Sequence, residues 1–103
     1  MAINNSALGT GNAANIYASS GSSAITTIHL CNYTANNAYA NLFLVPSGGT
    51  AGNGTIIYSN VSITSYNTLI IYAEKFILSD GDTVKANASA ANTITATISA
   101  IGI

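Results

Sequence analysis

Charge is what this sequence has least of. Asp, Glu, Lys and Arg make up 5% of its 103 residues, whereas about a quarter is usual for a soluble domain. Arginine is absent, and the charged residues all fall between positions 74 and 85: Glu74, Lys75, Asp80, Asp82 and Lys85. A freely diffusing domain normally keeps a surface of mixed charges. A surface made of Ser, Thr, Asn, Gly and Ala therefore indicates a protein that lies against neighbours.

The shortage of charged side chains excludes several functions. Binding to nucleic acid or to an anionic membrane requires a cluster of Lys or Arg, and two lysines do not supply one. For acid–base chemistry the chain has His29 and three acids within residues 74–82, whereas paired catalytic carboxylates flank a cleft. No Gly-x-Ser-x-Gly nucleophile motif occurs. We therefore predict that the protein is not an enzyme and has no catalytic residue and no cofactor.

Long apolar runs and a targeting segment are also missing. Residues 1–6 have neither the basic region nor the apolar region of a secretory signal. No apolar run approaches the roughly 18 residues of a membrane helix. A chain of 103 residues buries roughly 65% of the surface that its unfolded form exposes, which is enough for one core. We expect one soluble domain, made in a cytoplasm.

The single cysteine excludes a disulfide within the chain. Cys31 lies in an apolar, strand-like segment, so we expect a buried, inert thiol, with a disulfide between chains as the alternative. His29 and Cys31 are two residues apart and share a strand face, but zinc sites need three or four ligands. The sequence 80–82, Asp-Gly-Asp, is typical of a hairpin turn and has too few oxygen ligands nearby for calcium. We predict no metal site.

The residues that are present predict an all-β fold. Short apolar runs rich in β-branched residues alternate with turn-forming clusters about every 8–12 residues, and no segment has a convincing helical period. Strands are predicted at 14–18, 24–32, 38–45, 54–63, 68–73, 83–89 and 93–101. This pattern predicts a single antiparallel β-sandwich of seven to eight strands, either immunoglobulin-like or a jelly roll. The cysteine pair and core Trp of antibody domains are absent.

The two ends of the chain suggest an assembly. Residues 1–12 are small and polar, so we expect a flexible N-terminal arm, followed by a sandwich domain over 13–103. Residues 98–103 are largely apolar up to the last residue. A final strand with exposed isoleucines at the edge of a sheet would be prone to pair with other chains. We therefore expect Ile101 and Ile103 to be covered by another copy of the chain.

Tyrosines supply the other candidate contact residues. The chain has six Tyr and no Trp, and Tyr is favoured at interfaces because its ring is large, stiff and polar at one end. The alternative is that these rings cap the open ends of the sandwich. The candidates for contact are Tyr33, Tyr39, Tyr58 and Tyr66.

Several segments together carry a resemblance to a known group of proteins. They include Cys-Asn at the end of one predicted strand and Val-Pro at the end of the next, and they cover residues 14–21, 24–32, 42–48, 57–63, 74–84 and 97–103. In these segments the chain resembles the small β-sandwich virion proteins of tailed bacteriophages, especially those of marine and cyanobacterial phages. None of the segments is a catalytic motif.

The resemblance implies a structural component of a phage virion. Our first expectation is a non-enzymatic capsid decoration or cement protein, which binds the assembled shell and stabilises it. Its partners would be the major capsid protein or other virion proteins, together with copies of itself as a homo-oligomer. One alternative is a component of the tail, neck, baseplate or fibre. Another is a carbohydrate-binding module for host-surface glycans that uses Tyr rings and Asn side chains, which the absence of Trp disfavours.

Overall fold

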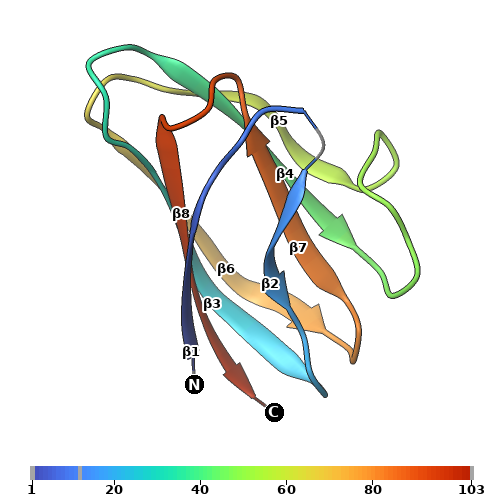
Figure 1. The fold of residues 1–103 in the computed structure, drawn as a ribbon. Helices are drawn as coiled ribbons and strands as arrows, with labels where there is room; N and C mark the ends of the chain where they lie inside the picture. Colours follow the sequence, from blue (N-terminus) through green and yellow to red (C-terminus); the bar gives the residue numbers. More distant parts are fainter. Residues whose placement is uncertain (1, 12, 103) are drawn as a thin grey trace.

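The protein folds into two antiparallel sheets packed face to face (Figure 1). The computed structural model describes residues 2–11 and 13–102, and within these ranges all side chains except those of residues 2 and 72–75. Eight strands lie in the described part: β1 (Ala2–Ala7), β2 (Ala14–Ala18), β3 (Ser23–Asn32), β4 (Ala38–Val45), β5 (Ile56–Ile63), β6 (Thr68–Leu78), β7 (Thr83–Ala88) and β8 (Ile94–Gly102). The predicted all-β sandwich is confirmed.

The strand order identifies the sandwich as a jelly roll. One sheet has the order β1-β8-β3-β6 and the other β2-β7-β4-β5. The first strand pairs with the last, the second with the seventh, the third with the sixth and the fourth with the fifth. This nested pairing divides eight strands between two sheets in the jelly-roll manner. In an immunoglobulin fold the first two strands lie in the same sheet, whereas here β1 and β2 do not, so the immunoglobulin-like alternative is excluded.

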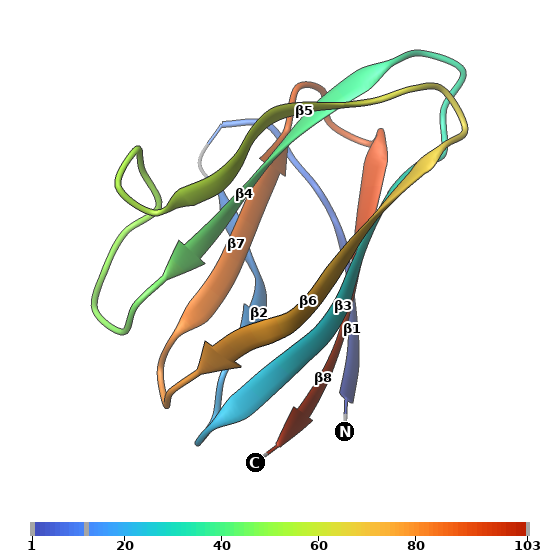
Figure 2. The ribbon, with the colours of Figure 1, turned by 180° about the vertical axis from the view of Figure 1, so that it is seen from behind.

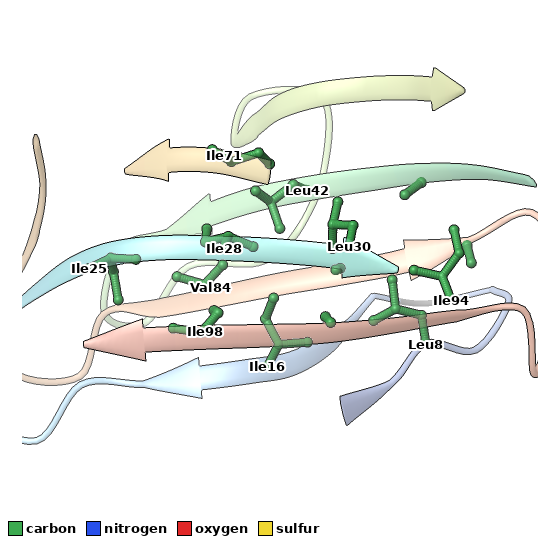
Figure 3. Close-up of a cluster of buried hydrophobic side chains, with 14 of the residues drawn as sticks. Leu8, Ile16, Ile25, Ile28, Leu30, Leu42, Ile71, Val84, Ile94 and Ile98 are labelled. Atoms are coloured by element: carbon green, nitrogen blue, oxygen red, sulfur yellow. The ribbon is translucent and has the colours of Figure 1, made fainter. Parts of the chain in front are cut away.

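Alternating side chains build the core between the sheets (Figure 3). Along β7 and β8 every second residue is buried, as the alternation of the sequence predicts. Large residues face small ones across neighbouring strands, for example Leu30 on β3 beside Ala96 on β8. Such pairs let the aliphatic side chains pack closely between the sheets, and Tyr17, Tyr58 and Phe76 pack against them. Its largest fully buried aliphatic side chains are Leu8, Ile25, Ile28, Leu30, Leu42, Ile94, Ile98 and Val84.

The predicted N-terminal arm is wrong. Residues 2–7 form β1, which pairs with β8 over its whole length, and the Leu8 N–H donates to the Ile94 carbonyl oxygen at 2.9 Å. Leu8 is 2% exposed and belongs to the core. The sandwich therefore begins at residue 2 and not at residue 13. The composition misleads because β1 is an edge strand whose side chains are largely exposed, so its sequence lacks the apolar alternation of a half-buried strand.

The last strand is not at an edge. β8 lies between β1 and β3 (Figures 1 and 2), so both of its backbone edges are hydrogen-bonded within the chain. The edges of the sandwich are β1 and β6 in one sheet and β2 and β5 in the other. β8 is therefore not an edge strand that another subunit has to cover. Any contact that Ile101 makes with a partner comes from its side chain.

β6 is longer than predicted. The sequence predicts its end at residue 73, but the strand continues through Glu74 and Lys75 to Leu78. Its pairing with β3 shifts register between Ile25 and Thr27. Such a bulge places extra residues of one strand opposite fewer of its partner. Residues 73–75 of β6, which include the charged pair, lie opposite Thr26 alone, and the strand continues past them to Leu78.

The connections gather at the two ends of the sandwich (Figures 1 and 2). One end carries the connections β1–β2, β3–β4, β5–β6 and β7–β8. The opposite end carries β2–β3, β4–β5 and β6–β7, with both chain ends nearby (Figure 1). Side chains that share an end or a sheet face therefore come from distant parts of the sequence.

Candidate functional site

The outer face of the β1-β8-β3-β6 sheet is a broad surface of Ile, Thr and other uncharged residues. Its rows follow from the strand register: Asn5, Thr97, His29 and Ile70 stand side by side across all four strands. We call this surface the Ile/Thr face and define it by its outward residues: Ile3, Asn5 and Ala7 on β1; Thr95, Thr97, Ser99 and Ile101 on β8; Ala24, Thr27, His29 and Cys31 on β3; and Thr68, Ile70 and Ile77 on β6.

Four isoleucines make this face unusually apolar. The exposed fractions are 69% for Ile3, 60% for Ile77, 42% for Ile70 and 36% for Ile101. None of the residues that define the face carries a fixed charge. Apolar residues scattered singly on a surface are ordinary, but several on one uncharged face indicate an interaction site. The β-branched side chains are also stiff, so they lose little conformational freedom when a partner covers them.

The predicted tyrosines divide between a surface and the interior. Tyr33, Tyr39 and Tyr66 are exposed and lie at or near the end that carries the β3–β4 and β5–β6 connections. The Tyr66 N–H donates to the Thr34 carbonyl oxygen at 3.1 Å, which holds these two connections together. Tyr58 is half-buried and packs against the core, so less of its ring is open to a partner than in the other three tyrosines.

The remaining predicted contact residues are the C-terminal isoleucines. Ile101 lies on the Ile/Thr face, in register with Ala24 of β3. Ile103 lies outside the described residues.

His29 and Cys31 share the Ile/Thr face, as their spacing predicts. The expectation that Cys31 is buried is wrong, because its side chain is half-exposed and free. Leu30 between them points inward and is buried, so the apolar sequence around Cys31 reflects its neighbours and not its own position. In the part of the chain that the structure describes, no three His, Cys, Asp or Glu side chains come close enough to hold a metal ion.

The aspartates of the β6–β7 turn bind backbone groups. The Asp82 carboxylate accepts hydrogen bonds from the N–H groups of Ser47 and Ser79, both at 2.9 Å. Asp80 accepts one from the Gly21 N–H at 2.8 Å. Gly81 between them has a φ of 87°, which favours glycine. The predicted turn is confirmed, and its carboxylates fasten three connections at one end of the sandwich.

Neither sequence nor structure comparison places this chain in a family. Comparisons with protein-family models, with curated proteins and with solved structures found no match. Within the described residues there is no helix that is long and apolar enough to cross a membrane. The function of this chain is therefore inferred from its surfaces.

Sequence analysis missed most of the Ile/Thr face. It singled out Ile101 but not Ile3, Ile70 or Ile77. A signal existed for two of them, because Ile70 and Ile77 fall in segments that the sequence reads as apolar. Their outward direction could not be read from the sequence, since the bulge between β3 and β6 changes which residues face the solvent. The arrangement as a whole is suited to binding a large, uncharged surface.

Proposed function

We propose that this chain is a non-enzymatic structural protein of a phage virion, and that it decorates the capsid by docking its Ile/Thr face on the assembled shell. The observation that carries the proposal is the group of four exposed isoleucines on one sheet face, whose defining residues carry no charge. The low charge of the whole chain and the resemblance to phage virion proteins support it. Jelly rolls are common in viral capsid proteins, although this is an analogy of fold and not of site.

The physical basis of docking is burial of apolar surface. Complete burial of one exposed Ile side chain contributes about 1.5–3 kcal/mol, and the four isoleucines are each already partly covered. Because the residues that define the face carry no charge, their burial avoids the desolvation penalty that a buried unpaired charge would add. A protein that binds only the assembled shell stabilises it by mass action. The shell would therefore resist heat and internal pressure better with the protein bound.

The first test is the number of copies per purified particle. Quantitative mass spectrometry would compare this protein with the major capsid protein. We expect hundreds of copies, which is the number that a capsid lattice requires. A few copies to a few tens would contradict decoration and favour the tail, neck, baseplate or fibre alternative. Absence from purified particles would overturn the virion proposal itself.

A second test changes the proposed docking face. Replacing Ile3 and Ile77 together by Lys is expected to weaken binding to shells that lack the protein by at least ten-fold, because each lysine would have to be desolvated at the interface. The matched control is Ile57→Lys, which changes an exposed isoleucine on β5 of the other sheet. Co-sedimentation with shells measures binding, and circular dichroism verifies that each variant melts like the unchanged protein.

The result is decided by the comparison between the two variants. If Ile57→Lys weakens binding and the double variant does not, the docking surface lies on the other sheet.

Sedimentation of the free protein tests the prediction of a homo-oligomer, and a single monomeric species at high concentration would contradict it.

A further inference from the structure

A polar hollow lies on the opposite side of the molecule from the Ile/Thr face. It has a volume of about 330 Å³ and is bordered by β4, β5, β7, the β1–β2 connection and the long β4–β5 connection. Asn41, Phe43, Asn53, Ile56, Ser59 and Asn87 are among the residues that line it. Every described residue of its lining is uncharged. The hollow therefore offers hydrogen bonds and apolar contact, but no ion pair.

A chain of hydrogen bonds fixes two amide side chains in the lining of the hollow. Asn87 Nδ2 donates to the Gly11 carbonyl oxygen at 2.7 Å, and Asn41 Nδ2 donates to Asn87 Oδ1 at 2.8 Å. Asn41 Oδ1 accepts from the Asn60 N–H at 2.8 Å. Because a backbone carbonyl and a backbone N–H stand at the two ends of the chain, the orientation of both amides is determined.

These amides keep unused hydrogen-bonding capacity. An amide nitrogen has two hydrogens and an amide oxygen accepts two bonds, and the chain described above uses one at each atom. Each of Asn41 and Asn87 thus retains one donor and one acceptor in a fixed direction. Groups held in this way bind a ligand without first losing conformational freedom. Beside them, the half-buried Ile56 and the small exposed part of Phe43, which is 8% exposed, form an apolar patch.

We propose that this hollow binds a neutral, hydroxyl-rich ligand, namely a hexopyranose sugar. A hydroxyl group both donates and accepts, which matches the mixed capacity of the two amides. The C–H groups of a pyranose ring match the Phe43–Ile56 patch. The volume falls near the lower end of the about 300–1,000 Å³ usual for small-molecule pockets, which suits one sugar ring. The ligand is either a free sugar or the terminal residue of a glycan.

This inference is independent of the proposed capsid role, because it concerns the other sheet. It narrows the glycan-binding alternative of the sequence analysis, which used Tyr rings and Asn side chains, to a site formed by two named asparagines and no tyrosine. Sugar binding here would add a second surface to the protein, facing away from the Ile/Thr face.

The test is a titration of the isotope-labelled, unmodified chain followed by NMR. The probes are free glucose, galactose and mannose, their methyl pyranosides, and inorganic phosphate as an anionic comparison. We expect neutral sugars to bind with millimolar affinity and to shift the amide signals of Gly52, Asn53 and Asn87. Methyl pyranosides imitate the end of a glycan, because their anomeric oxygen is capped. Tighter binding of the methyl form indicates a glycan, and tighter binding of the free form indicates a free sugar.

Two substitutions at Ser59 test whether the sugar binds in this hollow. Ser59 is exposed and lines the hollow from β5. Ser59→Phe is expected to fill the space and weaken sugar binding at least ten-fold, while Ser59→Ala leaves the space open and retains binding. Absence of shifts with every neutral sugar would overturn the proposal. Shifts with phosphate alone would overturn the ligand class, and equal binding by Ser59→Phe would overturn the site.

Discussion

Deletion of residues 1–7 is expected to lower the melting temperature sharply and to make the protein aggregate. The deletion removes β1 and leaves β8 with an unpaired backbone edge, where six residues of β1 now pair. An exposed edge of this kind is a template for pairing with other chains. It also leaves Leu8 without the strand that anchors it in the core. Circular dichroism would measure melting, and size-exclusion chromatography would measure association.

A point substitution separates the role of the core from that of the edge. Leu8→Ala keeps β1 but opens a cavity, and we expect it to reduce the free energy of unfolding by about 2–5 kcal/mol. Ile3→Ala is the matched control, because Ile3 lies on β1, which ends directly before Leu8, and is 69% exposed. We expect the control to stay within about 0.5 kcal/mol of the unchanged protein. If the deletion and Leu8→Ala both melted like the full chain, residues 1–7 would be the flexible arm that the composition suggests.

The strands that sequence analysis placed well share one property. β2 and β4 have the predicted bounds, and β3 and β7 each differ by one residue. They are flanked by turn-forming residues such as Gly21, Pro46 and Gly81, and in β7 an apolar face alternates with a polar one. Both signals are local, so they can be read from the sequence. β1 has neither a clear alternation nor a marked turn before it, and sequence reasoning therefore took it for an arm.

The candidate site could be predicted only in part, for a reason of topology. Ile3 and Ile101 come from opposite ends of the chain, yet they lie on the same face because β1 and β8 are neighbours. A local pattern gives the direction of a side chain relative to its own strand, but not which strands lie beside it. Tyr58 shows the same limit, because its position between the sheets follows from the pairing of β4 with β5. Composition alone, through the shortage of charge, predicts a face for contact but not the strands that form it.

Asn32→Leu is expected to be among the most destabilising substitutions at any polar position of this chain. Asn32 is 0% exposed, and its Nδ2 donates to the carbonyl oxygens of Asn36 and Ile63 at 2.7 and 2.9 Å. Its Oδ1 accepts from the N–H and hydroxyl of Thr34 at 3.0 and 2.8 Å. The leucine fills a similar volume but leaves these groups without partners, and each buried unsatisfied group costs about 1–3 kcal/mol. We expect a total loss of about 2–5 kcal/mol in urea unfolding.

A second asparagine in the same region provides the control for this prediction. Asn37 also joins the β3–β4 and β5–β6 connections, because its Oδ1 accepts from the Ser65 N–H at 3.1 Å, but it is exposed. Water replaces that bond when Asn37 is changed to Ala, so we expect a loss below about 1 kcal/mol. If Asn37→Ala lowered the free energy of unfolding as much as Asn32→Leu, stability would depend on the number of hydrogen bonds between the two connections. Burial of the asparagine would then not be the cause. A loss confined to Asn32 would show that stability at this end of the sandwich depends on one buried amide, which holds the loops that carry Tyr33 and Tyr66.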